Sequence, residues 1–132
     1  MADCWSLSLP SSGRSSWTNL NPSGTVPTAR WGSTYVYDDL NDRMVTFGGK
    51  DQSVTSLNDT QFLSLPSGGT TPSWQTVTVD GAPPSIRWAA SAVYDPDRDR
   101  MVVFGGTDGD TTFYNDVYPL TLPSSGNPTW GS

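Results

Sequence analysis

Short apolar runs separated by turn-forming residues recur along the chain. The run "STYVYD" (33–38), the turn-rich "DLNDR" (39–43) and the run "MVTF" (44–47) together predict a hairpin. Apolar residues occupy both faces of its two strands, which is typical of strands covered on both sides. We therefore expect this hairpin to lie between neighbouring sheets.

The same pattern returns later in the chain. Residues 30–49 align without a gap on residues 87–106, and twelve of the twenty positions are identical. Three further segments, 2–10, 58–66 and 115–123, align on an aspartate that lies seven residues before a proline. A tryptophan follows each of these prolines, at Trp17, Trp74 and Trp130. The chain is therefore an internal repeat, which favours an architecture of stacked units.

Each complete unit predicts four short strands, at about 31–38, 43–48, 60–65 and 74–79. We expect an all-β fold of four-stranded antiparallel meanders, about two per chain. We expect a single module of residues 1–132 with three parts. Residues 1–21 form the outer strands of a partial unit, residues 31–79 form a complete unit, and residues 88–132 form a second, largely complete unit.

The composition agrees with this fold class and excludes some functions. All thirteen acidic residues are aspartate, and the chain has no glutamate and no histidine. Strong helix formers are therefore scarce, whereas turn and strand formers are abundant. A net charge of −6 without a basic stripe argues against nucleic-acid binding. No apolar run approaches the roughly 20 residues that cross a bilayer, so we expect no membrane partner. The compartment cannot be inferred.

The repeat resembles the kelch repeats of β-propeller proteins. It shares with them a hydrophobic strand ending in a double glycine, an aromatic-containing strand and then a tryptophan. "LSLP" and "LTLP" stand where that family usually has Tyr-Asp, so side-chain contacts of the third strand are expected to differ. The resemblance implies that each unit is a propeller blade.

The double glycines have a physical reason within such a blade. Glycine adopts positive φ readily and lets neighbouring atoms approach the bare backbone. Gly48, Gly49, Gly105 and Gly106 are therefore expected to be structural. The recurring Trp17, Trp74 and Trp130 are expected to pack between blades.

Two blades and a fraction cannot close a ring, because propellers have roughly four to eight. The open faces must therefore be covered. We expect copies of the chain to assemble head to tail, for example three two-bladed chains in a six-bladed ring, with the leading strands of one copy completing the last blade of another. The alternative is that the chain is a fragment of a longer kelch protein.

The resemblance places the functional surface at the loops around one mouth of the propeller, here 21–30, 49–58, 80–87 and 106–115. It implies that Arg30 and Arg87 present guanidinium groups to carboxylates of a peptide ligand. The alternative is that each arginine pairs with a nearby aspartate or stacks on Trp31 or Trp88. The full set of candidate ligand-binding residues is Arg30, Trp31, Arg87, Trp88, Asp51, Asp108 and Asp110.

The partner is expected to be a protein or peptide, or alternatively a carbohydrate, since six tryptophans could stack on sugar rings. An enzyme is not expected, because no histidine and no nucleophile motif is present. No cofactor is expected. The alternate carboxylates of "DPDRD" (95–99) and those of "TDGD" (107–110) resemble the start of a calcium loop, but the glycine and distal glutamate of an EF-hand are missing from "DPDRD", so no metal site is predicted.

Overall fold

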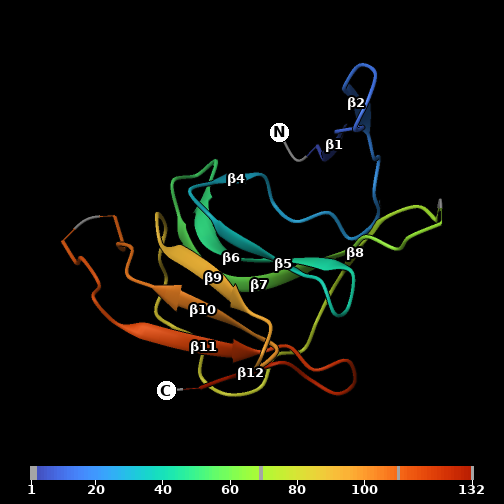
Figure 1. The fold of residues 1–132 in the computed structure, drawn as a ribbon. Coiled ribbons are helices and arrows are strands. Elements are labelled where there is room, and N and C mark those ends of the chain that lie inside the picture. The colour runs from blue at the N-terminus through green and yellow to red at the C-terminus, as the bar shows by residue number, and fades with distance from the viewer. Residues whose placement is uncertain (1–2, 69, 110, 132) are drawn as a thin grey trace.

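A six-stranded sheet and a four-stranded sheet make up most of the molecule, and each contains a four-stranded antiparallel meander (Figure 1). The computed structural model describes residues 3–68, 70–109 and 111–131, and within these ranges it contains strands and no helix, hence none that could cross a membrane. The meander of the first sheet consists of β5 (Thr34–Asp38), β6 (Arg43–Asp51), β7 (Ser56–Ser64) and β8 (Ser73–Gln75). The second sheet consists of β9 (Ser91–Asp95), β10 (Arg100–Phe104), β11 (Val117–Thr121) and β12 (Thr129–Trp130). The predicted all-β class is confirmed.

Two short strands extend the first sheet. β4 (Arg30–Trp31) pairs with the end of β6 beyond an irregularity between Phe47 and Gly49, and β3 (Ser23–Gly24) runs parallel to β8. The strand expected at 31–38 is therefore interrupted, since Gly32 has a φ of 65°. The strand expected at 74–79 is shorter than predicted, although Val77 and Val79 still pack against the core.

A separate N-terminal hairpin is formed by β1 (Trp5–Ser8) and β2 (Ser16–Asn19). Figure 1 shows it beyond the first sheet, on the side away from the second sheet. Its register repeats that of the outer strands of both sheets. The same leucine–tryptophan pair occurs three times, as Leu7–Trp17, Leu63–Trp74 and Leu120–Trp130.

The core lies between the two sheets. One face of the first sheet supplies Val36, Val45, Phe47 and Phe62, and the second sheet and the segments next to it supply Met101, Val103, Leu120, Leu122 and Trp130. The rings of Phe47 and Trp130 meet edge to face, with centroids 4.8 Å apart. Burial of these apolar side chains is the main force that holds the two sheets together.

Polar contacts reinforce the junction between the sheets. The buried Asp38 accepts hydrogen bonds from Arg43, at 2.6 Å, and from the hydroxyl of Tyr94 on the second sheet, at 3.1 Å. Arg43 also donates to the carbonyl of Leu122, at 2.8 Å. Desolvation and the hydrogen bond to Asp38 raise the pKa of Tyr94 well above its usual range, which keeps this phenol a proton donor.

Equivalent positions of the two sheets differ sharply in burial. Phe47 is 1% exposed, whereas its repeat equivalent Phe104 is 52% exposed. On the opposite faces, Tyr35 of the first sheet is exposed, whereas its equivalent Ala92 packs against the core. Each sheet thus has one face covered by its neighbour and one face left open.

Candidate functional site

Arg30 ties the segment before β5 to the third strand of the first sheet. Its Nε donates to the carbonyl of Thr28, and one terminal nitrogen donates to the carbonyl of Gly48, both at 3.1 Å. Both terminal nitrogens bind the carboxylate of Asp59, with an Nη2–Oδ2 distance of 2.9 Å. This fork-to-fork geometry fixes the guanidinium plane.

Arg87 repeats each of these contacts in the second sheet. It donates to the carbonyls of Ser85 (3.1 Å) and Gly105 (2.9 Å) and binds both carboxylate oxygens of Asp116, at 2.6 and 3.1 Å. Its guanidinium also lies 4.2 Å from the ring centroid of Tyr114. Arg87 is only 1% exposed, so it belongs to the interior of the molecule.

The electrostatics of the two aspartates follow from these pairs. The hydrogen bond from Arg87 lowers the pKa of Asp116 below its usual value, against a smaller effect of burial. Burial acts most strongly on Asp59 and raises its pKa, but the hydrogen bonds from Arg30 and Gln61 together outweigh it, and the pKa of Asp59 is also lowered. Both arginines thus pair with an aspartate of the same chain, which was the alternative to ligand binding. Their binding of an external carboxylate stays a prediction.

Trp31 and Trp88 lie together near the two arginines. Their rings meet edge to face with centroids 4.7 Å apart, and the Nζ of the buried Lys50 lies 5.1 Å from the Trp88 ring centroid. The indole Nε1 of Trp88 is buried and has no hydrogen-bond partner among the described residues. Trp31 is half exposed, so it offers an aromatic surface next to the segment 21–30, one of the loops expected at the mouth.

The candidate aspartates of the mouth loops organise the loops themselves. Asp51 Oδ1 accepts hydrogen bonds from the backbone amides of Ser53 and Thr55, each at 2.9 Å. Asp108 Oδ1 accepts hydrogen bonds from the backbone amides of Thr111 and Thr112, at 3.2 and 3.0 Å. Such side-chain caps are a common use of aspartate in turns. Asp110 lies outside the described residues.

The loop of Asp95 and Asp99 forms ion pairs and hydrogen bonds. Asp95 pairs with Arg100 at 2.8 Å and with Arg98 at 3.3 Å, and Asp99 accepts from the Tyr94 hydroxyl at 3.1 Å. Across residues 3–68, 70–109 and 111–131, no three acidic, histidine or cysteine side chains are grouped so that they could hold a metal ion.

Three of the four residues of the double glycines lie where an added Cβ would clash with neighbouring atoms. A Cβ on Gly48 would lie 2.5 Å from the carbonyl oxygen of Arg87, and one on Gly106 would lie 2.8 Å from that of Trp88. Gly105 is less crowded, with the carbonyl of Tyr114 at 3.2 Å, although its φ is 67°. A Cβ on Gly49 would lie 2.3 Å from Ser33 Oγ. The structural role of the double glycines stays a prediction.

The recurring tryptophans have different surroundings. Trp130 packs against Phe47 between the sheets, and Trp74 is partly buried. Trp17, in the N-terminal hairpin, is 64% exposed. The three tryptophans occupy the same position of the repeat, so their different exposure depends on which neighbouring segments cover each of them.

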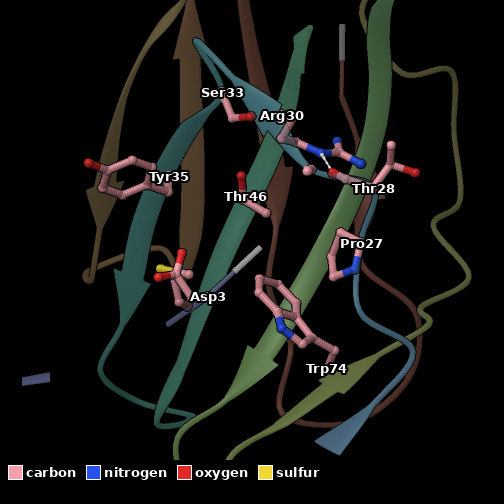
Figure 2. Close-up of a pocket in the computed structure, with 10 residues that line it drawn as sticks. Asp3, Pro27, Thr28, Arg30, Ser33, Tyr35, Thr46 and Trp74 are labelled. Atoms are coloured by element: carbon pink, nitrogen blue, oxygen red, sulfur yellow. Dashed lines mark hydrogen bonds between the residues drawn. The ribbon is translucent and has the colours of Figure 1, made fainter. Parts of the chain in front are cut away.

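A pocket opens on the uncovered face of the first sheet, near the start of the N-terminal hairpin (Figure 2). Its lining comes from the pre-β1 segment, the approach to β4, the inner strands and β8: Asp3, Pro27, Thr28, Ala29, Arg30, Ser33, Tyr35, Met44, Thr46 and Trp74. The buried Nε1 of Trp74 has no hydrogen-bond partner among the described residues. Of these lining residues, the sequence analysis named only Arg30 as a candidate ligand-binding residue.

Comparisons with known proteins agree with the repeat architecture. A family model described as "KLHDC2/KLHL20/DRC7 Kelch-repeats domain" matches residues 2–131. The chain is 33% identical over 114 residues to Adagio-like protein 1 of Oryza sativa subsp. japonica, covering 86% of this chain and 17% of that protein. It is 34% identical over 93 residues to Dynein regulatory complex subunit 7 of Chlamydomonas reinhardtii, covering 70% of this chain and 8% of that protein. The chain thus spans a small part of the length of both relatives.

Proposed function

Because the chain belongs to the kelch-repeat family, whose members generally serve as non-catalytic protein-interaction modules, we propose that it is a binding and assembly module whose open blade faces are covered by further blades. In this proposal the first and second sheets are two propeller blades. Mouth loops carry the interaction surface, because a rigid scaffold with variable loops is well suited to binding.

The unequal burial of equivalent residues is the observation that carries this proposal. Phe47 and Val36 are buried because the second sheet covers them, whereas Phe104 and Val93 occupy the same positions and face solvent. Val117 adds a third large apolar side chain to this open face. Fully burying each such side chain is worth about 1.5–3 kcal/mol, so covering the face with another blade gives a substantial driving force.

The simplest source of further blades is other copies of the chain. Three two-bladed chains would close a six-bladed ring through head-to-tail contacts of the kind already present between the two sheets. In such a ring the open face of Phe104 packs against the face of Tyr35 and Tyr37 on the next copy.

The alternative source is the remainder of a longer kelch protein. Two observations favour it: the chain covers 17% or less of Adagio-like protein 1 and Dynein regulatory complex subunit 7, and the N-terminal hairpin is only the outer half of a blade. The second sheet already has its own β11 and β12, so it does not need the hairpin of another copy to complete it.

Phe104→Asp tests the assembly through the open face. A charge at the centre of this face should prevent association, because an unpaired carboxylate cannot be buried cheaply. Val54→Asp is a matched control, since Val54 is similarly exposed but lies in a mouth loop. Sedimentation velocity should show smaller species for Phe104→Asp and wild-type behaviour for Val54→Asp. Equal masses for all three proteins would refute the role of this face.

The ligand class at the mouth requires a separate experiment. Because Trp31 is half exposed beside the mouth loops, Trp31→Ala should weaken binding of a protein or peptide while preserving the fold. Peptide and glycan arrays probed with wild type and variant would separate the two classes. Selective binding to one sugar, lost in Trp31→Ala, would favour the carbohydrate alternative over the peptide.

A further inference from the structure

Lys50, the single lysine of the chain, is a buried cation near the end of β6. Its exposed fraction is 7%. Across residues 3–68, 70–109 and 111–131, the ion pairs are all formed by arginines, and Lys50 Nζ takes part in no ion pair and no hydrogen bond. A buried charge without a partner costs folding free energy. Lys50 therefore offers an ammonium group that the described chain leaves unpaired.

A second unpaired donor lies beside Lys50. The indole Nε1 of Trp88 is buried and donates to no described residue. Lys50 Nζ lies 5.1 Å from the centroid of the Trp88 ring. Since most buried polar atoms in proteins have a hydrogen-bond partner, two neighbouring donors without one point to an acceptor that binds there.

Gly109 marks the point where the two donors meet. A Cβ built on Gly109 would lie 2.3 Å from Lys50 Nζ and 2.8 Å from Trp88 Nε1. Hydrogen bonds from nitrogen to oxygen span about 2.7–3.2 Å. The two nitrogens are therefore close enough for one oxygen atom to accept a hydrogen bond from each.

This point lies where two of the mouth loops touch. Ser56 Oγ donates to the carbonyl of Asp108 at 2.6 Å, which joins the loop 49–58 of the first sheet to the loop 106–115 of the second. Gly109 is itself partly exposed. The donors therefore lie at a loop junction that a small solute can reach, and not in the core between the sheets.

The other charged groups of the mouth are engaged elsewhere. Arg30 and Arg87 bind aspartates of their own sheets, so their charges are already compensated. Asp51 and Asp108 accept hydrogen bonds from backbone amides of their own loops, and neither pairs with Lys50 in the part of the chain that the structure describes. Lys50 is thus the buried cation of these loops that can take an external anion.

We propose that Lys50 Nζ and Trp88 Nε1 form a binding site for an oxyanion, such as phosphate or a small carboxylate. The ammonium group supplies the charge, and the indole N–H supplies a second donor with a fixed direction. Each residue of the site lies within the two sheets and their loops, so the site needs no further blade. The proposal deepens the binding role proposed for the mouth loops and rests on it only in assigning a function to these loops.

Titration of isotope-labelled protein with inorganic phosphate or with acetate tests the site by NMR. Sodium chloride holds the ionic strength constant, because screening changes with salt. Trp88→Phe identifies the Trp88 Nε1–H peak, and this peak should move downfield and saturate. The peak of Trp130 should stay in place, although its Nε1 is also buried without a partner among the described residues. The anion that saturates the shift at the lower concentration identifies the group that the site prefers.

Lys50→Met removes the ammonium group and keeps an apolar side chain. It should weaken binding of the anion about tenfold or more, because a charged hydrogen bond is lost. Arg98→Met is the matched control, since Arg98 is a cation in the turn between β9 and β10 and its side chain is 65% exposed. This variant should bind as wild type does. No saturable shift with either anion in wild type, or equal shifts in wild type and Lys50→Met, would overturn the proposal.

Thermal unfolding provides a second readout that does not use the Trp88 peak. A ligand that binds only the folded state raises the Tm, so the preferred anion should raise the Tm of wild type above its value in chloride of equal ionic strength. The gain should be smaller in Trp88→Phe, which keeps Lys50 but lacks the indole N–H. If Lys50→Met does not fold, this comparison decides, and equal gains in wild type and Trp88→Phe would refute the site.

Failure of this site can be told apart from failure of the proposed function. A chain that associates through the face of Phe104 and binds a peptide through Trp31, but binds neither anion, would remain a binding module without the Lys50–Trp88 site. A chain that binds an anion at Lys50, but neither associates nor binds a peptide, would keep the site and lose the proposed function.

Discussion

At the scale of single residues, the two repeated arginines act as braces within their own sheets. Arg30 and Arg87 each join the carbonyl of a preceding residue, the carbonyl of the first glycine and the carboxylate of an aspartate seven residues before a proline. Removing one partner leaves the other charge without its hydrogen bonds. The resulting loss of folding free energy is larger than the net stabilisation that the intact pair provides.

The Arg87–Asp116 pair predicts a specific pH dependence. The pKa of Asp116 is lowered in the folded chain, so its contribution to stability is present above the unfolded value of about 3.9 and is lost as the pH falls through the folded pKa. Asp116→Asn should therefore be less stable than wild type at neutral pH, with a difference that shrinks below about pH 4. Urea unfolding at several pH values measures this difference.

Asp39→Asn is the control for this pH dependence, because Asp39 is exposed in the turn between β5 and β6. Its stability should follow that of wild type at every pH. A difference between Asp116→Asn and wild type that stays constant from neutral to acid pH would contradict the assigned role of Asp116.

At the scale of elements, the first sheet contains a meander whose second strand, β6, bends at its double glycine. Gly48 and Gly49 have φ values of 67° and 100°, and the register of β6 with β7 shifts between Phe47 and Gly49. The bend lets the end of β6 pair with β4 while the carbonyl of Arg87 approaches the Gly48 backbone closely. Glycine is required here by both conformation and space.

Gly48→Ala should therefore be strongly destabilising. Gly126→Ala is a matched control, because Gly126 has a φ of 84° but no neighbouring atom within 4 Å of an added Cβ. Gly126→Ala should lose only the free energy needed to hold alanine at positive φ, about 1–2 kcal/mol, whereas Gly48→Ala also introduces a clash with the backbone. Thermal unfolding should show the larger loss for Gly48→Ala. Equal losses would mean that the close approach of Arg87 does not matter.

Much of this element structure could be predicted from the sequence. The alternation of apolar residues at 33–47 and the repeat alignment indicated the four-strand order, and both hold in the structure. The break at Gly32 was missed, because a single glycine inside an apolar pattern does not reveal its φ. The early end of β8 was also missed. Val77 and Val79 keep the alternating pattern of a strand and pack against the core, but they lie beyond the end of β8.

Prediction of the candidate site was less complete. The sequence singled out Arg30 and Arg87, but it left open whether their guanidinium groups face a ligand or an aspartate. That choice depends on side-chain direction over a separation of 29 residues, which no local pattern encodes. The pocket beside Met44 was not anticipated, because its lining brings together residues that lie far apart in the sequence, from Asp3 to Trp74.

At the scale of the whole molecule, the central feature is the pair of open faces. One face of each sheet is buried by the other sheet, and the two remaining faces carry Phe104 and Val93 on one side and Tyr35 and Tyr37 on the other. Exposed apolar patches of this kind mark interaction sites in soluble proteins. The account therefore predicts that the chain is completed by further blades.

The mass of the wild-type chain in solution tests this claim most directly. Light scattering coupled to size exclusion, at several concentrations, should give a species about three times the chain mass of 14.2 kDa, or four times for an eight-bladed ring. The open faces are then buried between copies. A monodisperse, cooperatively folded species of 14.2 kDa at all concentrations would contradict the claim that these faces require a covering partner.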